Sequence, residues 1–307
     1  MIKQFNKYLL LINSLGNKKH INLIIEFLSR FFSEELKNND FLIKQTEDEF
    51  STGKFSKEFS EKYYNSLIIS AGGDGTVHEI VNSINFSNTS LAILPNGTGN
   101  DFATFLYGGM KLEDILNNLD KATFIKSDLL KVNDYYCINV TSFGYETKVL
   151  AKAVELKNRY SFLGNFSFIL AVPLTIKELA GVNYDYELRL ADGEVKKGSG
   201  TYIINALCNG SKYGGGFTPA PSADITDGII DFNQVENISF WSLFSAMIKY
   251  KKGTHIGSVK ESHDTKVVSG FIKGNSGLLQ GNIDGELHVF DKIEFKVLPK
   301  LLNLMRI

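Results

Sequence analysis

A glycine-rich segment with one acidic residue, residues 72–76, reads Gly-Gly-Asp-Gly-Thr. The apolar residues before it are typical of a buried strand, and the apolar residues after it recur at helical spacing. A glycine-rich turn from a strand to a helix N-terminus lets backbone N–H groups approach an anion. Because the carboxylate of Asp74 would repel bound phosphates unless a divalent cation lay between them, the segment predicts a site for phosphates and a metal ion. The alternative is that Asp74 only caps the helix.

A second turn, rich in Gly, Asn and Thr, covers residues 95–101. It follows the apolar run 91–94 and precedes a predicted helix. Two such loops at the ends of neighbouring strands would face one crevice, where open α/β sheets bind ligands. An ordinary turn with Asn and Gly at positive φ would explain either loop alone, but the pair favours a ligand site.

Three further Asp-Gly pairs begin at Asp192, Asp227 and Asp284. The ordinary explanation for such a pair is a hairpin turn, and we keep it for Asp192, between residues 186–190 and 194–197. Asp284 and Glu286 are two residues apart, so they would project on one side if the chain is extended there.

The elements that must position these residues change in kind along the chain. The first 125 or so residues alternate strands and helices, as an α/β layer fold requires. The strands are predicted at residues 8–12, 41–45, 67–70 and 91–94, and the helices around residues 21–32, 76–85 and 112–119. Beyond Phe124, alternating runs predict an antiparallel β-rich domain, with strands at residues 135–140, 184–190, 200–207, 229–235 and 287–297. One apolar interruption, residues 159–180, is predicted to be helical and broken by Pro173.

Composition narrows the class of protein. With 307 residues, 43% of them hydrophobic, the chain is long enough for two domains, and its net charge of -1 argues against a nucleic-acid binder. The two cysteines, Cys137 and Cys208, form no disulfide framework, which suits a reducing cytoplasm. No stretch approaches the roughly 20 apolar residues of a membrane span.

The order of these motifs resembles a known enzyme family. Gly-Gly-Asp-Gly-Thr, then His-Glu-Ile-Val-Asn-Ser-Ile, then Leu-Pro-Asn-Gly-Thr-Gly-Asn-Asp-Phe-Ala are similar to the catalytic domain of diacylglycerol kinases, a family with bacterial soluble lipid kinases and sphingosine and ceramide kinases. NAD kinases share the first motif and a broadly similar fold, whereas the third motif indicates the lipid-kinase branch. The resemblance covers nearly the whole chain. It implies a Rossmann-like α/β nucleotide domain of the phosphofructokinase and NAD kinase type in residues 1–125, to which about residues 299–307 return, and a lipid-binding antiparallel β-sandwich in residues 126–298.

The resemblance also implies a nucleotide site. Its residues would be Asn13, Gly16, Asn17, Lys18, Thr46, Gly72, Gly73, Asp74, Gly75, Thr76, Asn96, Gly97, Thr98, Asn100 and Asp101. The first phosphate loop of the family usually reads Asn-Pro-x-Ser-Gly-Lys, whereas residues 13–18 read Asn-Ser-Leu-Gly-Asn-Lys. Lys18 is therefore either a phosphate contact or a solvated lysine.

The acidic residues receive roles from the same resemblance. Residues 221–231 match a structural magnesium loop, in which the side chain of Asp227 and the carbonyls of Asp224 and Ile229 would bind Mg²⁺; the alternative is a turn that feeds a strand. Asp284 and Glu286 match an Asp-Gly-Glu motif that supplies the catalytic base. Asp284 is preferred as the base, with Glu286 as its partner or the alternative base.

Two more residues have implied positions. Asp74 would complete the catalytic set by helping Mg²⁺ to bridge the phosphates. Asp128 matches an aspartate at the domain junction, and it either joins the metal network or begins a surface strand.

These matches predict an ATP-dependent lipid kinase that uses Mg²⁺ and phosphorylates a lipid hydroxyl, with diacylglycerol as the first acceptor. The alternatives are an NAD kinase-like enzyme for a soluble nucleotide and a non-catalytic lipid- or nucleotide-binding regulator. The apolar residues 159–179 and the lysines 249, 251, 252 and 260 are candidates for membrane contact, or else a core helix and a solvated face. We expect a cytoplasmic protein that visits the inner face of the membrane and binds no nucleic acid. An exposed strand edge in the β domain could support a homodimer.

Overall fold

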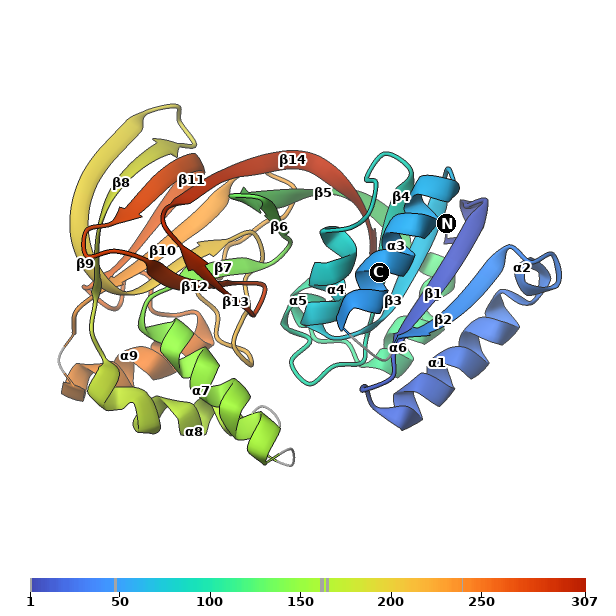
Figure 1. Cartoon of the computed structure of the whole chain (residues 1–307), viewed down its shortest axis with the longest axis horizontal. Coiled ribbons are helices and arrows are strands. Elements are labelled where there is room, and N and C mark those ends of the chain that lie inside the picture. Colours follow the sequence, from blue (N-terminus) through green and yellow to red (C-terminus); the bar gives the residue numbers. More distant parts are fainter. Residues whose placement is uncertain (1, 47–48, 161–162, 164–165, 239) are drawn as a thin grey trace. The chain divides into compact units, whose positions relative to one another are not determined.

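The chain forms two compact units. The structure, a computed structural model, describes residues 2–46, 49–160, 163, 166–238 and 240–307. Unit 1 comprises Met1–Ser127 and Lys300–Ile307, and unit 2 comprises Asp128–Pro299. The chain passes between the units within strands β5 (Thr123–Val132) and β14 (Ile293–Arg306) (Figure 1). Unit 1 has α/β architecture and unit 2 is an antiparallel β structure, so the predicted fold class is confirmed.

Unit 1 is built on a parallel sheet whose inner strands are buried on both faces, whereas the edge strand β2 is partly exposed. Its strand order is β2 (Phe41–Thr46), β1 (Lys7–Asn13), β3 (Ser66–Gly72), β4 (Thr89–Pro95) and the end of β14. Every residue of β3 is buried, which explains why this strand is a continuous apolar run rather than an alternating one. The last strand of the sheet pairs with β4 through Asn303 and Leu304.

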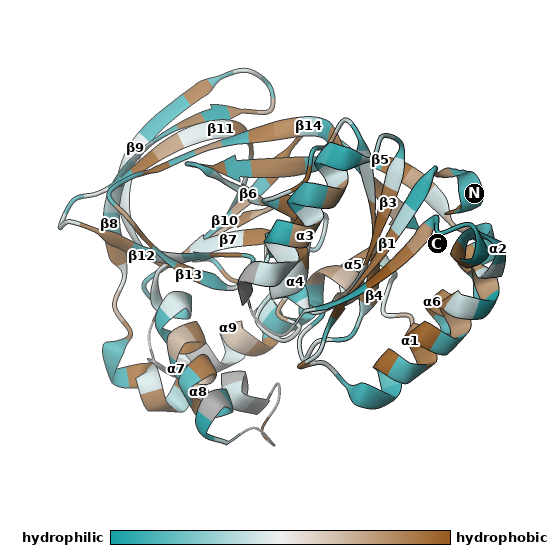
Figure 2. Cartoon of the chain, turned by 45° about the vertical axis from the view of Figure 1, so that its right-hand side comes forward, coloured by the Kyte–Doolittle hydropathy of each residue, from teal (hydrophilic) through white to brown (hydrophobic). Residues whose placement is uncertain are grey.

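Helices cover both faces of this sheet. They are α1 (Lys18–Phe31), α2 (Ser33–Lys37), α3 (Glu49–Lys62), α4 (Asp74–Val81), α5 (Asp101–Leu106) and α6 (Leu112–Asn117), with 3-10 turns at Ile2–Gln4 and Leu119–Lys121. Figure 2 shows α1 and α6 on one face of the sheet and α3 and α4 on the other. Sequence patterns missed α3, because its phenylalanines are scattered among Ser, Lys and Glu and mark no strong apolar face.

Unit 2 is formed by long strands that change partners. The strand path is β13 (Glu286–Phe290), β12 (Leu279–Ile283), β7 (Val140–Phe143), β9 (Val195–Cys208), β10 (Ile230–Glu236), β11 (Ser262–Gly274) and β14; β8 (Val182–Leu190) pairs with both β9 and β11, and β5 pairs with β14 and β6 (Tyr135–Cys137). The first half of β9 pairs with β8 and its second half with β10. The interior is apolar and includes Phe143, Phe232, Ile272 and Ile293.

Two predicted strands are wrong in extent. Residues 135–140 form β6 and the start of β7 rather than one strand, because the chain breaks pairing at Ile138 and Asn139. Residues 287–297 likewise belong to β13 and β14, which are separated at Asp291 and Lys292. The hairpin predicted at Asp192 is confirmed, since β8 and β9 pair up to Arg189 and Val195 on either side of it.

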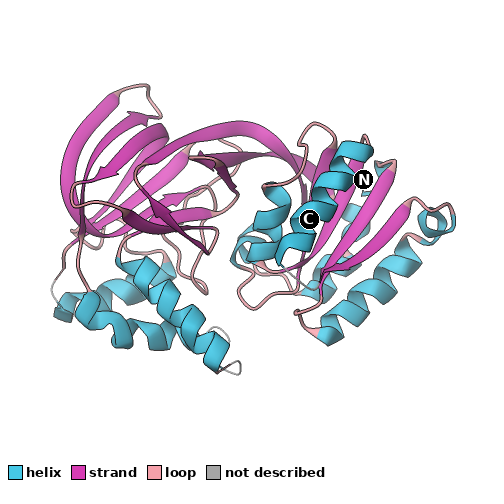
Figure 3. Cartoon of the chain, in the orientation of Figure 1, coloured by secondary structure: helices cyan, strands magenta, loops and turns pink. Residues whose placement is uncertain are grey.

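The helices of unit 2 are α7 (Tyr145–Arg159), α8 (Phe166–Thr175) and α9 (Phe240–Lys252), with a 3-10 turn at Ile176–Glu178. They gather on one side of the strands (Figure 3). The predicted break at Pro173 is wrong, because Pro173 lies inside α8, which ends two residues later. Thr175 supports this last turn by donating its hydroxyl to the carbonyl of Ala171 at 2.9 Å. Residues 161–162 and 164–165 of the predicted segment lie outside the described residues.

In the described part of the chain, no helix combines the length and the apolar character needed to span a bilayer.

Candidate functional site

The carboxyl ends of the parallel strands of unit 1 lie level with one another. Asn13 pairs with Thr46 between β1 and β2, and Gly72 pairs with Pro95 between β3 and β4. The segments that follow these strands therefore leave from one edge of the sheet, which is where open α/β sheets bind ligands.

Glycines allow the loops at this edge to interlock. A Cβ atom added to Gly97 would overlap the backbone of Gly73, and one added to Gly16 would overlap Asn96. A Cβ atom on Gly72 would similarly overlap the side chain of Thr76. The three loops after β1, β3 and β4 thus touch at positions where no larger residue fits, so the structure brings these predicted residues together.

Asp74 ties the loop after β3 to the loop after β4. Its Oδ2 accepts the N–H of Asp101 and its Oδ1 accepts the N–H of Phe102, each at 3.1 Å. These amides belong to the first turn of α5 and have no partner within that helix. Asp74 therefore acts as a cap, but for α5 rather than for its own helix, whose N-cap is Gly73.

Asn96 carries a buried amide that makes no hydrogen bond. Its side chain is 2% exposed, and neither Oδ1 nor Nδ2 has a partner among the described residues. Its backbone N–H donates to the carbonyl of Gly72 at 2.9 Å, which fixes it between the two loops. Leaving such a group unsatisfied costs about 1–3 kcal/mol, so Asn96 is a side chain that a polar ligand could stabilise.

Asn13 and Thr46 sit at the ends of their strands and are held there. Asn13 donates its Nδ2 to Thr76 Oγ1 at 3.2 Å, which links the first loop to α4. Thr46 is buried and donates its hydroxyl to the carbonyl of Ile12 at 3.3 Å. Both residues therefore border the edge where the loops meet.

Asn17 and Lys18 lie at the start of α1. Asn17 is the N-cap and accepts the N–H of Lys19 at 3.0 Å, so its side chain serves the helix. Lys18 is the first residue of α1 and is exposed. Its ammonium group is available to an anion at the helix N-terminus, in agreement with either interpretation of this residue.

The rest of the second loop is organised by Asn100. This residue has a left-handed backbone, with φ of 54°. Its amide bonds Gly97 reciprocally, since it accepts the Gly97 N–H and donates to the Gly97 carbonyl, both at 2.8 Å. Thr98 is exposed at the tip of the loop, and Gly75 lies in the first turn of α4.

In unit 2, the predicted magnesium loop is a compact turn. Asp227 Oδ1 accepts the N–H of Ile229 at 2.9 Å, and Asp224 Oδ1 accepts the N–H of Thr226 at the same distance. Gly228, with φ of 75°, donates its N–H to Asp128 at 2.6 Å. Asp128 is fully buried within β5, so the alternative that it begins a surface strand is wrong.

Negative charge accumulates around this loop. Burial raises the pKa of Asp227, the N–H of Ile229 opposes that rise, and the nearby carboxylates of Asp224, Asp231 and Asp128 add to it. Lys266 forms an ion pair with Asp231. No group of three or more His, Cys, Asp or Glu side chains within the described residues could hold a metal ion, so a cation here would depend on backbone carbonyls and water.

Asp284 does not lie in extended chain. With φ of 53° at Asp284 and 97° at Gly285, the two residues form the tight turn between β12 and β13. This geometry is the mirror-image turn that favours Asp-Gly in hairpins. The condition under which Asp284 and Glu286 would project on one side, an extended chain, is therefore not met.

The carboxylate of Asp284 is nonetheless held in a specific position. It is 8% exposed and accepts the N–H of Ile138 at 3.1 Å and of Asn139 at 2.9 Å, together with the thiol of Cys137 at 3.1 Å. These donors come from the last residue of β6 and from the break between β6 and β7. Glu286, by contrast, is exposed at the start of β13.

Sequence reasoning missed the partners of Asp284 and one buried acid. Asn139, which interrupts the alternating run 135–140, was the available signal for the first. Glu146, in the first turn of α7, accepts the N–H of Asn205 at 3.1 Å through Oε1, while its buried Oε2 has no hydrogen-bond partner among the described residues. Burial raises the pKa of Glu146 to about 8. Nothing in the local sequence distinguishes this glutamate from a helix N-terminal acid.

Comparison with protein families covers both units. Residues 7–132 match the diacylglycerol kinase catalytic domain, and residues 139–306 match the YegS C-terminal NAD kinase beta sandwich-like domain. The chain belongs to the diacylglycerol kinase catalytic-domain family. The predicted family is therefore confirmed, and the protein is of the lipid kinase type.

Relatives of this lipid kinase family align with most of the chain. A protein assigned as a lipid kinase in Staphylococcus epidermidis is 26% identical over 258 residues, which cover 82% of this chain and 81% of the relative. A probable YegS-like lipid kinase of Shewanella frigidimarina is 26% identical over 250 residues, which cover 78% of this chain and 75% of the relative.

The fold is shared with a solved structure. A Bacillus anthracis protein assigned as a diacylglycerol kinase superposes with a TM-score of 0.77 at 23% identity, and the match covers 99% of this chain and 98% of that one. At this identity the likeness establishes the fold of this kinase and does not identify its substrate.

Proposed function

We propose that this protein is an ATP-dependent lipid kinase that transfers the γ-phosphoryl group to a lipid hydroxyl, with diacylglycerol as the first acceptor and a phosphatidate-type product. The single observation that carries the proposal is Asn96, a buried and unpartnered amide between two glycine loops at the carboxyl edge of a parallel sheet. In a chain of this kinase family, a nucleotide is the ligand that best satisfies such a site.

The nucleotide would be held mainly by backbone. The loop at residues 72–76 brings main-chain N–H groups to the N-terminus of α4, where phosphates are favoured, and the loop at residues 95–101 packs against it. Lys18 adds an exposed cation at the start of α1. Asp74 orders the two loops relative to each other through its bonds to α5.

The magnesium loop fits the ion that kinases require. Burial and, to a lesser extent, the neighbouring carboxylates raise the pKa of Asp227, so a divalent cation there would relieve the repulsion between these carboxylates. The side chain of Asp227 and the carbonyls of Asp224 and Ile229 would hold it, since the carboxylate of Asp224 already serves the N–H and hydroxyl of Thr226. When bound, Mg²⁺ neutralises negative charge on phosphates and stabilises local structure.

Transfer needs a base for the acceptor. In the proposed step, the carboxylate of Asp284 takes the proton of the lipid hydroxyl, the hydroxyl oxygen forms a bond to the γ-phosphorus, and the bond from that phosphorus to the leaving ADP breaks. Ile138 and Asn139 fix the orientation of this carboxylate through their N–H groups. Glu286 is the alternative base because it is exposed at the start of β13, two residues along the chain.

The helices of unit 2 supply the surface for a lipid interface. Leu170 and Leu174 on α8 are 43% and 58% exposed, and Ile248 on α9 is 45% exposed. Lys251 and Lys252 at the end of α9 are exposed cations of the kind that an anionic leaflet attracts. We propose that these helices contact the membrane from the cytoplasmic side.

A homodimer is a further proposal. Strand β13 ends the strand path of unit 2, and its Leu287 and Val289 are 49% and 62% exposed. An exposed apolar edge strand is a template for pairing with a second copy. Sedimentation equilibrium of the wild type and a Val289→Lys variant would test it, because a lysine on the edge opposes pairing.

The test of function is a transfer assay with γ-labelled ATP against diacylglycerol, a sphingoid base and NAD. We expect label in phosphatidate, dependence on lipid vesicles, and loss of transfer when the nucleotide loops are closed by Gly97→Ala. Label in NADP without vesicles would instead identify an NAD kinase-like enzyme. Nucleotide binding without transfer to any acceptor would identify a non-catalytic regulator.

A further inference from the structure

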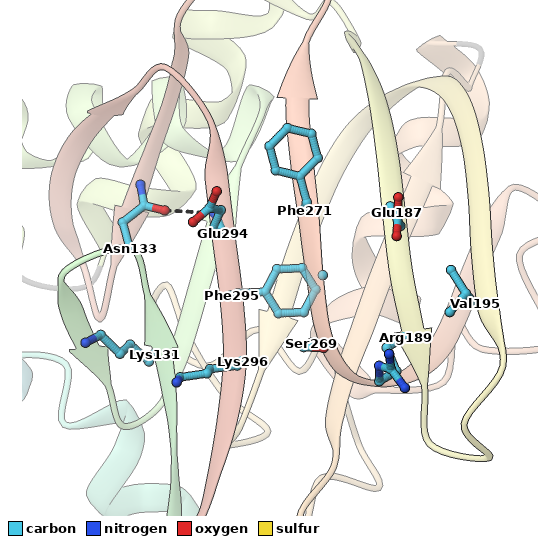
Figure 4. Close-up of a pocket in the computed structure, with 11 residues that line it drawn as sticks. Lys131, Asn133, Glu187, Arg189, Val195, Ser269, Phe271, Glu294, Phe295 and Lys296 are labelled. Carbon is cyan, nitrogen blue, oxygen red and sulfur yellow. Dashed lines mark hydrogen bonds between the residues drawn. The ribbon is translucent and has the colours of Figure 1, made fainter.

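A solvent-open groove lies on the outer face of the sheet of unit 2, and none of the residues assigned above to nucleotide, metal or base lines it. It has a volume of about 530 Å³ and runs across β5, β14, β11, β8 and the start of β9. Figure 4 shows Lys131, Lys296 and Arg189 toward one end of the groove and Glu294 and Glu187 nearer the other.

Strand register explains this separation of charge. Ser269 on β11 pairs with Lys296 on β14 and with Arg189 on β8, so these three residues form one row across three strands. Neighbouring strands lie about 5 Å apart, so the two cationic residues start about 10 Å from each other with the hydroxyl of Ser269 between them. Both side chains are long enough to lean inward over Ser269.

The next row on the same face has the opposite character. Phe271 pairs with Glu294 on β14 and with Glu187 on β8. Both glutamates already have cations, because Glu187 pairs with Lys197 at 2.8 Å and Glu294 pairs with Lys292 at 2.6 Å. The acidic row is therefore neutralised by lysines that do not line the groove.

The cationic row has no such compensation. Neither Arg189 nor Lys296 makes an ion pair within the described residues, and the ammonium of Lys131 lies over the ring of Tyr136, 5.6 Å from its centre. Like charges side by side on one sheet face are unfavourable unless something neutralises them. Two guanidinium or ammonium groups flanking a hydroxyl form the donor set that binds a phosphate.

We propose that this groove binds the phosphate of a phosphomonoester, with Arg189 and Lys296 on either side of it and Ser269 beneath it. A monoester phosphate carries nearly two negative charges at neutral pH and so matches two uncompensated cations better than a diester does. Lys131 lies at the same end of the groove and strengthens the positive field. The ligand is either a soluble phosphomonoester or the headgroup of a phosphatidate-type lipid, which share this chemistry.

Calorimetric titration of the full chain tests the proposal. The probes are glycerol 3-phosphate and, separately, phosphatidylcholine vesicles with and without phosphatidate. All titrations contain saturating non-hydrolysable ATP analogue, so that the nucleotide site is filled and does not take the phosphate. The groove variant is Arg189→Gln with Lys296→Gln. The matched control is Lys273→Gln, because Lys273 is an exposed cation on the same strand and face as Ser269 but does not line the groove.

We expect the groove variant to bind the phosphate probe at least about tenfold more weakly than the wild type, and the control to change affinity less than about twofold. Binding of glycerol 3-phosphate would identify a soluble ligand, whereas binding only to phosphatidate vesicles would identify the lipid headgroup. Equal affinities for the groove variant and the wild type, or no binding of either probe to the wild type, would overturn the proposal. Because the nucleotide site is occupied throughout, a negative result here leaves the transfer assay unaffected.

Discussion

The carboxylate of Asp74, at the start of α4, accepts the backbone N–H of Phe102, at the start of α5, at 3.1 Å. Two helices that follow different strands of the sheet are thereby joined by one acidic side chain. The same residue is proposed to stand beside the phosphates of ATP. Its structural and chemical contributions can be separated by measuring stability and turnover on the same variant.

Asp74→Asn should lower both stability and turnover, with the larger effect on turnover. The asparagine side chain keeps one oxygen that can accept an N–H group of α5, but its NH₂ group would face the second N–H group, donor against donor. We therefore expect a loss of about 1–2 kcal/mol in the free energy of unfolding. Turnover should fall by about 100-fold or more, beyond what that loss explains. Thermal unfolding and transfer rates measured well below the melting temperature check this. Asp120→Asn, at an exposed site on a 3-10 turn, is the control. Wild-type turnover in Asp74→Asn would leave Asp74 with the capping function alone.

Asp284→Asn and Glu286→Gln should distinguish the two candidate bases. Asp284 accepts N–H groups from Ile138 and Asn139 and the S–H group of Cys137, so an asparagine amide would oppose one of these donors and cost about 1–3 kcal/mol in stability. If Asp284 is the base, turnover should also fall by about 100-fold or more while nucleotide affinity is retained. Glu286→Gln should keep full stability, because Glu286 is exposed.

The ratio of turnover losses decides the assignment. A larger loss in Glu286→Gln than in Asp284→Asn would transfer the base to Glu286. The stability of Asp284→Asn serves as an internal check on the hydrogen bonds from the β6–β7 break. If its melting temperature equals that of the wild type, those hydrogen bonds contribute little in solution.

Glu146 should make the stability of the protein fall as the pH rises. Burial raises its pKa in the folded state to about 8, above its ordinary value of 4.5. Between these values the folded state binds more protons than the unfolded state, so the free energy of unfolding decreases with increasing pH. The stabilisation is complete below about pH 4.5 and is lost by about pH 8. Burial also raises the pKa of Tyr213 and Tyr250, so neither tyrosine titrates within this window.

Glu146→Gln removes this titration. We expect the variant to gain about 1–3 kcal/mol relative to the wild type between pH 5 and pH 8, because glutamine is never charged. Denaturant unfolding at both pH values measures the difference. A pH-independent difference between the two proteins would contradict a buried, protonated Glu146.

Exposed leucines on α8 should control access to lipid vesicles. We expect Leu170→Ser with Leu174→Ser to weaken binding to anionic vesicles about tenfold or more, since each leucine contributes about 1–2 kcal/mol when it leaves water. Phosphorylation of a short-chain acceptor in detergent-free solution should remain unchanged. Tyr64→Ser is the matched control, because Tyr64 is 73% exposed and lies in unit 1. Equal vesicle binding by both variants would remove α8 from the membrane surface.

The sequence predicted the parts of this molecule whose chemistry is local. The spacing of apolar residues changes from that of a strand to that of a helix at Gly72 and again after Leu94. Because each change involves only a few adjacent residues, the sequence predicts where these loops of unit 1 lie. The pairing of β3 with β4 then brings those loops to one edge. The sequence did not decide between a turn and an extended segment at Asp284, because an Asp-Gly pair fits both until its backbone angles are known.

Other features depend on contacts between distant residues. The row of Lys296, Ser269 and Arg189 exists only because three strands pair in one register, and no local pattern encodes that register. Pro173 is the opposite case. A proline usually breaks a helix, but α8 contains Pro173 and ends two residues after it. The sequence pattern did not predict helix α7, because charged residues are spread along it and interrupt its apolar face.

Strand β14 begins in unit 2 and finishes in unit 1, where Leu302, Leu304 and Met305 are fully buried. During synthesis, the parallel sheet of unit 1 is therefore completed only after residues 300–307 leave the ribosome, when β4 gains its second neighbour. A fragment that stops at residue 127 would lack this strand and expose apolar surface. Completion of the unit 1 sheet thus depends on residues that are synthesised after all of unit 2.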